Sequence, residues 1–278
     1  MAHRTGRPRS GLVTLADDLG WAYAAQLKAV LVRTVAPGRL IDLAHDLPAH
    51  RVREAAFVVR AMAQRFPAGT IHVVVVDPGV GGRRAPIAIA CRDGSALVGP
   101  DNGVLAPLAE ALGGGVAYRL DPSRLPAPAR VGTTFDGRDL FAPAAARLAA
   151  GARAAALGPR ASFRRLDLPP PVRRRAGAVG TVVHVDRFGN LITDIPSGWV
   201  PGTLRRLSSR VRGRTRAVRW TTSYEAGGRS RLLGLGSSFG TVELAVGEGR
   251  AADRLGAGTG DRVRLAWPVP RSRRGVKR

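Results

Sequence analysis

The sequence has almost no cysteine, few aromatic residues and no long apolar run. One of its 278 residues is a cysteine, Cys91, which excludes an internal disulfide and a zinc site built from several cysteines. No apolar run approaches the roughly 18 to 20 residues that a membrane-spanning helix needs. Asp17 and Asp18 interrupt the stretch where a signal peptide would have its apolar core. These absences predict a cytoplasmic protein without a membrane anchor.

Lysine is also scarce, although the chain is strongly basic. Lys28 and Lys277 are the two lysines, so arginine supplies the other 42 basic residues behind the net charge of +24. Such a charge is typical of nucleic-acid binding, because basic side chains neutralise phosphates. However, aromatic residues are 5% of the chain and do not alternate with the arginines, so no base-stacking platform is evident. We therefore expect no specific nucleic-acid binding, and solvated basic tails at 1–9 and 271–278.

Two domains are expected from the pattern of apolar residues. The composition, 45% hydrophobic and 23% charged, is that of a globular protein. Residues 10–165 alternate between short apolar runs and helical patterns, which predicts an α/β domain with a largely parallel sheet. After a proline-rich linker at 169–171, residues 175–270 contain short β runs without helical periodicity. They predict a smaller β domain that is barrel-like.

Polar residues follow the predicted strands of the first domain. Each such segment has an ordinary explanation, since aspartate caps helices and Asp-Asn-Gly forms turns. Five of them in one domain favour a ligand site, because loops meet at the carboxyl ends of parallel strands. The five segments are Asp17-Asp18, Asp42 with His45, Asp77–Arg84, Asp101–Gly103 and Phe135–Asp139.

Several common chemistries lack the residues they need. The glycines at 79–82 have neither a P-loop ending nor a dinucleotide-binding pattern. The five histidines show no metal-ligand spacing, so we expect no metal site. A serine nucleophile elbow is absent, and Cys91 lies inside an apolar strand pattern where an inert core thiol is the simpler interpretation.

Five motifs follow one another between Leu12 and Trp267: FPAGTIHVVVVDPGVG at 66–81, PDNG at 100–103, GRDLFAP at 137–143, DRFGNLIT at 186–193 and SSFG at 237–240. In order and spacing the sequence resembles the SAM hydroxide adenosyltransferases, which are adenosine-forming S-adenosyl-L-methionine hydrolases related to fluorinating and chlorinating enzymes. The resemblance implies an enzyme in which water or hydroxide attacks C5′ of the ribose and yields adenosine and L-methionine. The sulfonium is already an activated leaving group, so no cofactor is expected.

The resemblance also implies roles for individual residues. Members of the family hold the attacking water with an Asp-Arg-His trio, whose first two residues match Asp77 and Arg84. The third position is Asp136 here, and it is the catalytic candidate that departs from the pattern. Asp18 matches the acid that binds the ribose hydroxyls. The remaining substrate-binding candidates, for the adenine and methionine ends, are Asp186, Phe188, Asn190 and Ser238.

Two departures keep an alternative open. A carboxylate at Asp136 is a weaker base than imidazole at neutral pH. The loop after Gly20 is two residues shorter than in the family and lacks a second acid. The alternative is a protein that binds S-adenosylmethionine or adenosine with little or no turnover.

Halogenating relatives lack the acid at Asp77, which disfavours halogenation. The resemblance further implies a homotrimer with sites between subunits.

Overall fold

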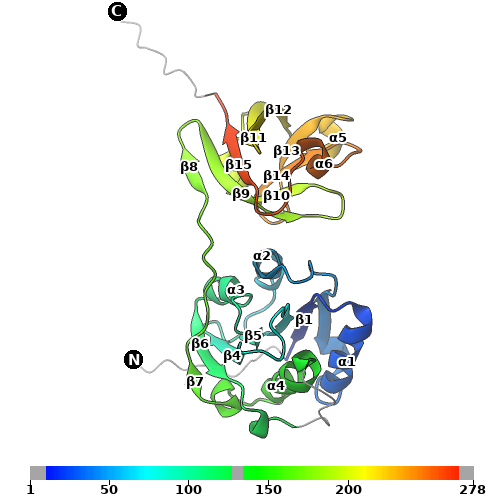
Figure 1. Ribbon diagram of the computed structural model, residues 1–278, viewed down its shortest axis with the longest axis vertical. Coiled ribbons are helices and arrows are strands. Elements are labelled where there is room, and N and C mark those ends of the chain that lie inside the picture. The colour runs from blue at the N-terminus through cyan, green and yellow to red at the C-terminus, as the bar shows by residue number, and fades with distance from the viewer. Residues whose placement is uncertain (1–10, 127–133, 269–278) are drawn as a thin grey trace, which may run out of the picture. The chain divides into compact units, whose positions relative to one another are not determined.

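The computed structural model describes residues 11–126 and 134–268, which fall into two compact units, Met1–Asp167 and Leu168–Arg278 (Figure 1). The basic tails expected at 1–9 and 271–278 lie outside the described residues. Each unit has a hydrophobic core of its own. We call them unit 1 and unit 2.

Unit 1 is an α/β unit, as the sequence predicts. Its seven-stranded sheet has the order β2-β1-β3-β5-β4-β6-β7, in which the first four strands run parallel and the last three are added antiparallel. The strands are β1 (Val13–Asp17), β2 (Leu40–Ala44), β3 (Ile71–Val75), β4 (Pro86–Cys91), β5 (Ala96–Pro100), β6 (Gly115–Arg119) and β7 (Arg160–Ala161).

Helices cover both faces of this sheet (Figure 1). Val73 and Val75 of β3 join the core beneath α1 (Trp21–Leu31) and α4 (Ala142–Ala149). Val74 and Val76 join the opposite core, beneath α2 (Val52–Ala63) and α3 (Ala106–Ala111). Burial on both faces is why this strand is a continuous run of apolar residues. Short 3-10 turns complete the unit at Pro37–Arg39, Pro122–Arg124 and Ala154–Leu157.

Unit 2 is a closed barrel of seven strands, which confirms the barrel-like prediction. The strands follow the order β10-β14-β13-β12-β11-β15-β9, and β9 pairs back to β10; β8 extends the sheet beyond β9. Their bounds are β8 (Val172–Arg174), β9 (Gly177–Val185), β10 (Leu191–Pro196), β11 (Arg206–Val211), β12 (Arg214–Trp220), β13 (Leu232–Gly236), β14 (Thr241–Val246) and β15 (Arg262–Ala266). The helical segments are a 3-10 turn at Ser197–Trp199, α5 (Tyr224–Gly227) and α6 (Ala251–Leu255).

One strand prediction in unit 2 is wrong. The sequence favours a single β run over 211–218, whereas the structure has the hairpin of β11 and β12 with its turn at Arg212 and Gly213. Both turn residues have positive φ, 47° and 77°, which two-residue hairpin turns require. The arginine at the first turn position hid this signal, since asparagine or aspartate is the usual residue there.

Cys91 is buried, as the sequence predicts. Cys91 is 2% exposed, and burial raises the pKa of its thiol to about 12, so the thiol stays protonated at neutral pH. It is therefore core rather than nucleophile. No helix within 11–126 or 134–268 combines the length and apolar character needed to cross a membrane.

We predict that His72 makes folding sensitive to mild acid. This residue of β3 is 1% exposed and bonds the Thr14 hydroxyl at 2.8 Å through Nδ1. Burial lowers the pKa of His72 to about 4, against a smaller raising effect of Asp93. The unfolded chain binds a proton near pH 6.5, so between about pH 6.5 and 4 protons favour unfolding.

The expected change is a loss of about 2 kcal/mol in the free energy of unfolding between pH 7 and pH 5 that is due to His72 alone. Urea unfolding at the two pH values measures it, with His72→Gln as the comparison. The loss should be about 2 kcal/mol larger in the unmodified protein than in the variant. Equal losses would contradict the prediction.

Candidate active site

The centre of the site in unit 1 is a guanidinium held by two carboxylates. Arg84 Nε donates to Asp77 Oδ1 at 3.0 Å and to Oδ2 at 2.9 Å, and Nη2 also donates to Oδ2. The same Nη2 donates to Asp136 Oδ2 at 2.5 Å. The three side chains are 5%, 10% and 6% exposed for Asp77, Arg84 and Asp136. The structure thus brings together the three residues predicted to be catalytic, which we call the trio.

The loops after β3 and β5 place Asp77. Asp77 follows the end of β3, and its carbonyl accepts the N–H of Val80 at 3.2 Å in a tight turn. The Asn102 amide, from the PDNG motif, donates to Val76 O at 2.8 Å and so ties the loop after β5 to the residue before Asp77. Asn102 Oδ1 accepts the N–H of Val104 at 3.1 Å. Asn102 therefore positions the loop, a role that the sequence alone did not reveal.

Asp136 lies at the start of a π-helical turn, Gly137–Phe141, which leads into α4. The sequence predicts a loop over 135–139, and this is wrong from Gly137 onward. The reason is local bonding, because the N–H groups of Arg138 and Asp139 both donate to Phe135 O. The ring of Phe141, fully buried, lies 5.6 Å from the Arg84 guanidinium and closes one side of the trio.

The trio contains two acids and one guanidinium, so its charges do not cancel. Burial opposes the charged form of Arg84, but the hydrogen bonds that it donates to both carboxylates outweigh this effect and raise the pKa of Arg84 above its ordinary value. With both acids ionised the trio carries a formal charge of −1. Such a site suits a cationic ligand, because opposite charges attract strongly where water is scarce.

Asp18 lies at the same edge of the sheet as Asp77. Parallel pairing of β1 and β3 places Asp17 opposite Val75, and the N–H of Asp18 donates to Val75 O at 3.3 Å. The Asp18 carboxylate accepts the N–H of His50 at 3.0 Å. The candidate ribose-binding acid is therefore held by backbone bonds to the end of β3 and to the loop before α2.

A buried acid and histidine support this loop. His45 Nδ1 lies 2.7 Å from Asp17 Oδ2, and both side chains are 1% exposed or less. Burial raises the pKa of Asp17, against the lowering effect of its hydrogen bond with His45. The N–H of Gly20 donates to His45 O, and that of Leu47 to Asp17 O. The two loops that flank Asp18 are therefore fastened to each other.

The polar contacts of His45 extend through Asp42 to the surface residue Lys28. His45 Nε2 lies 3.0 Å from Asp42 Oδ1 in poor alignment for a hydrogen bond, and Asp42 Oδ2 accepts from Lys28 Nζ at 2.6 Å. The segment of Asp42 with His45, suspected from the sequence to serve a ligand, thus has a structural role. Trp21 packs edge-on against His45 at 4.6 Å yet is 67% exposed.

In unit 2 the DRFGN motif forms one tight turn. Asp186 Oδ1 accepts the N–H groups of Phe188 and Asn190, each at 2.9 Å, and Oδ2 accepts the Asn190 amide at 3.0 Å. Asn190 is 5% exposed, whereas the ring of Phe188 is 60% exposed. Asp186 and Asn190 thus hold the turn, and Phe188 is the side chain that the turn presents. Direct ligand contacts from Asp186 and Asn190 stay predictions.

A second turn of unit 2 carries Ser238. Ser237 Oγ accepts the N–H groups of Phe239 and Thr241 at 3.3 and 3.4 Å, so Ser237 shapes the turn and Ser238 lies exposed on it. Phe239 lies 6.4 Å from the ring of His184, the residue before the last of β9. The turn is therefore anchored to the strand that leads into the DRFGN motif.

Exposed aromatic rings accompany the candidate residues of both units. Trp21 and Tyr23, 67% and 54% exposed, follow Asp18. Tyr224, 50% exposed, donates to the buried carboxylate of Glu243, and it shares with Phe188 the barrel of unit 2. No sequence pattern singles out Trp21, Tyr23 or Tyr224. Their exposure is the missing signal, since large exposed rings mark binding surfaces.

The described residues contain no group of three or more His, Cys, Asp or Glu side chains that could hold a metal ion. The trio itself offers two carboxylates and a guanidinium.

Comparisons with known proteins identify both units. The SAM hydroxide adenosyltransferase N-terminal domain matches residues 13–158, and the C-terminal domain of the same family matches residues 180–264. An (R)-S-adenosyl-L-methionine hydrolase of Salinispora tropica is 41% identical over 258 residues, which cover 91% of this chain and 97% of that protein.

Two further comparisons set the range of similarity. The crystal structure of an uncharacterized conserved protein from Thermotoga maritima is 30% identical, with a TM-score of 0.85 over 92% of this chain and all of that one. A fluorinase from Actinoplanes sp. is more distant, 26% identical over 66% of this chain and 71% of that protein.

We predict that His45 contributes to stability through Asp17. His45→Leu leaves a buried carboxylate without its ring partner and should lower the free energy of unfolding by about 3 kcal/mol. Asp17→Asn keeps a polar group that can bond the ring and should cost about 1 kcal/mol. Urea unfolding at pH 7 measures both. A smaller loss in His45→Leu than in Asp17→Asn would refute the pairing.

Proposed function

The chain belongs to the SAM hydroxide adenosyltransferase family, and we propose that it hydrolyses S-adenosyl-L-methionine to adenosine and L-methionine in the cytoplasm. The observation that carries the proposal is the buried trio of Asp77, Arg84 and Asp136, in a chain that is 41% identical to a named hydrolase. That relative is named for the R form of the substrate, and we propose the same sulfonium epimer here.

The trio suits a water molecule that attacks C5′ of the ribose. As the new C–O bond forms, the C–S bond breaks and its electron pair stays on sulfur. Methionine therefore leaves as a neutral thioether. The proton released from the water passes to a carboxylate and then to solvent. Arg84 stabilises hydroxide character on the attacking oxygen, while Asp77 and Asp136 orient it. Asp18 accepts hydrogen bonds from the ribose hydroxyls.

We propose that unit 2 supplies the rest of the site. Phe188 offers an exposed ring for the adenine, and Ser238 a hydroxyl for the amino-acid end of the substrate. Asp186 and Asn190 hold the turn that presents Phe188. In the homotrimer that we propose, unit 2 of one subunit completes the site on unit 1 of its neighbour. Exposed aromatic rings beside the candidate residues of both units support this arrangement.

The other functions have less support. The trio contains the acid that halogenating enzymes lack, and the matched fluorinase is more distant than the hydrolase. A binding protein without turnover remains the outcome to test, because Asp136 replaces the histidine of the family. The high similarity to a named hydrolase favours turnover.

We predict that Asp77→Asn and Arg84→Met each slow adenosine formation by at least about 100-fold, since they remove groups that position the water. Asp136→His should raise the turnover rate by about tenfold, because imidazole is the better base at neutral pH. Chromatography of adenosine and methionine after incubation with either sulfonium epimer measures these rates. Equimolar products are expected from the unmodified protein.

Asp167→Asn is the matched control, because Asp167 is an exposed acid of the same unit outside the trio. It should leave the rate unchanged. Tight calorimetric binding of the substrate without products would show a binding protein and overturn the hydrolase. An unchanged or lower rate in Asp136→His would refute the argument about the missing histidine.

We predict that two inactive variants restore activity when mixed, if sites lie between subunits. Asp77→Asn removes a group of unit 1, and Phe188→Ala removes one of unit 2. After denaturation and refolding together, mixed trimers contain some sites with both groups intact. With random assembly about a quarter of the sites pair an intact unit 1 with an intact unit 2, so about a quarter of the normal activity should return. Activity no higher than the sum of the separately refolded variants would contradict shared sites.

A further inference from the structure

The barrel of unit 2 carries an outward face rich in arginine. In the register of β11 and β12, Arg206 lies opposite Arg219, and in that of β11 and β15, Arg210 lies opposite Arg264. Arg206 and Arg210 are four residues apart on one strand, so they point to the same side. Leu207 and Ser209, which point to the other side of the strand, are buried. Like charges directly opposite each other destabilise a sheet, so these arginine pairs lower the stability of unit 2.

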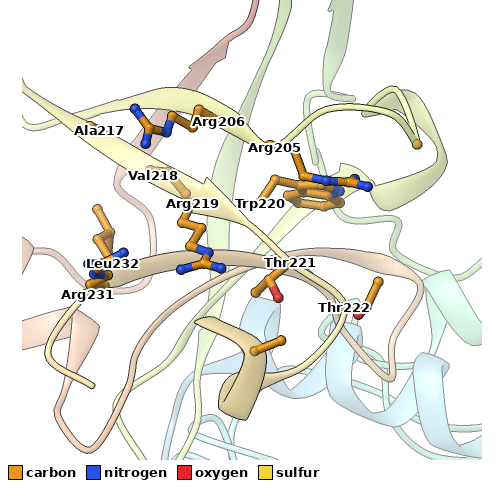
Figure 2. Close-up of a pocket in the computed structure, with 12 residues that line it drawn as sticks. Arg205, Arg206, Ala217, Val218, Arg219, Trp220, Thr221, Thr222, Arg231 and Leu232 are labelled. Carbon is orange, nitrogen blue, oxygen red and sulfur yellow. The ribbon is translucent and has the colours of Figure 1, made fainter. Parts of the chain in front are cut away.

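Two hollows are lined by these arginines. The first, of about 730 Å³, has side chains of β11, β12 and the segments beside β13 around it (Figure 2). Four arginines and one indole belong to its lining: Arg205, Arg206, Arg219, Arg231 and Trp220. The second, of about 570 Å³, is lined by Arg174, Arg210, Arg212, Arg262 and Arg264, together with Asp261.

The two hollows are neighbours on one surface. Arg206 lines the first and Arg210 the second, and four residues of a strand span about 13 Å. The second hollow continues over β15 to Arg174 of β8. From β12 to β8 the sheet crosses five strands, about 19 Å at ordinary strand spacing. We call this surface the arginine face.

Acidic side chains do not neutralise it. Residues 168–278 contain 22 Lys and Arg against seven Asp and Glu. Among the described residues no arginine of the two hollows forms an ion pair with a carboxylate, whereas Arg229 and Arg250 elsewhere on the unit pair with Glu248 and Asp253. Asp261 is the acid within the second hollow, and its carboxylate accepts the N–H of Gly258 at 2.9 Å.

We propose that the arginine face binds the phosphodiester backbone of a nucleic acid without reading its base sequence. Guanidinium groups form paired hydrogen bonds with phosphate oxygens, and several of them in a row suit a chain of phosphates. The face is too long for one phosphate, and Asp261, the acid that lines its second hollow, already accepts the N–H of Gly258. Trp220 in the first hollow offers a ring beside the backbone path. This proposal is independent of the hydrolase activity.

The test is fluorescence anisotropy of the full-length chain with labelled 20-nucleotide single-stranded RNA, single-stranded DNA and duplex DNA. We expect binding at micromolar protein in low salt, and an affinity that falls steeply with salt. The variant Arg206→Gln, Arg210→Gln, Arg219→Gln and Arg264→Gln should bind at least about tenfold more weakly. Its slope of log affinity against log salt should be smaller by about three for single strands. The three probes decide which nucleic acid is bound.

The matched control removes the same charge from unit 1. Arg33→Gln, Arg53→Gln, Arg92→Gln and Arg153→Gln replace four exposed arginines that lie outside the trio. It should bind within about twofold of the unmodified chain. Equal weakening of both variants would show attraction by bulk charge and overturn the proposal, as would failure of the unmodified chain to bind any probe.

Retained adenosine formation would show that the face variant is folded, since none of its residues belongs to the proposed active site. If the quadruple variant does not fold, Arg206→Gln with Arg210→Gln replaces it, compared with Arg33→Gln and Arg53→Gln. Nucleic-acid binding tests the arginine face, and adenosine formation tests the hydrolase. Because the two are measured separately, either proposal can fail while the other holds.

Discussion

A guanidinium held between two carboxylates is the interaction on which the site of unit 1 depends. Arg84 is only 10% exposed, and a cation so placed is tolerable because Asp77 and Asp136 bond it directly. Asp77 follows β3, Arg84 precedes β4, and Asp136 begins the π-helical turn before α4. None of the three lies within a strand. Their mutual bonds therefore fix segments that the sheet alone would leave free, and removing Arg84 would leave two buried carboxylates without a cation.

Asp136 stands where the resemblance implies a histidine, and this changes both the charge of the trio and the strength of its base. With neutral imidazole the trio would be formally neutral, whereas with a carboxylate it carries −1. A negative centre attracts the sulfonium most strongly before the reaction, because the positive charge disappears as the C–S bond breaks. Such attraction stabilises the bound substrate more than the transition state, which favours affinity over turnover. Lower base strength acts in the same direction, so both effects point to a tightly binding and slow enzyme.

The fold class could be predicted because it depends on patterns local in the chain, whereas the three members of the trio were predicted from the resemblance to a family. Two-sided burial of β3 appears as an apolar run, and Arg84 lies seven residues after Asp77. The support beneath them was not predictable. The pair of Asp17 and His45 joins residues 28 positions apart, and Asn102 reaches the loop after β3. Such contacts depend on the exact separation of loops, which composition and spacing do not encode.

The arginines of unit 2 show why composition and position need separate explanations. A bias in the genome can account for arginine in place of lysine throughout the chain, and it acts on both units alike. It does not account for arginines that face one another across β11, β12 and β15 while the acids of the unit cap turns or pair elsewhere. The inner side of the barrel supplies its stability through residues such as Val211 and Val263, so the outer side is free to change. The proposed binding of a phosphodiester backbone would explain the position of these arginines, which their abundance in the chain does not.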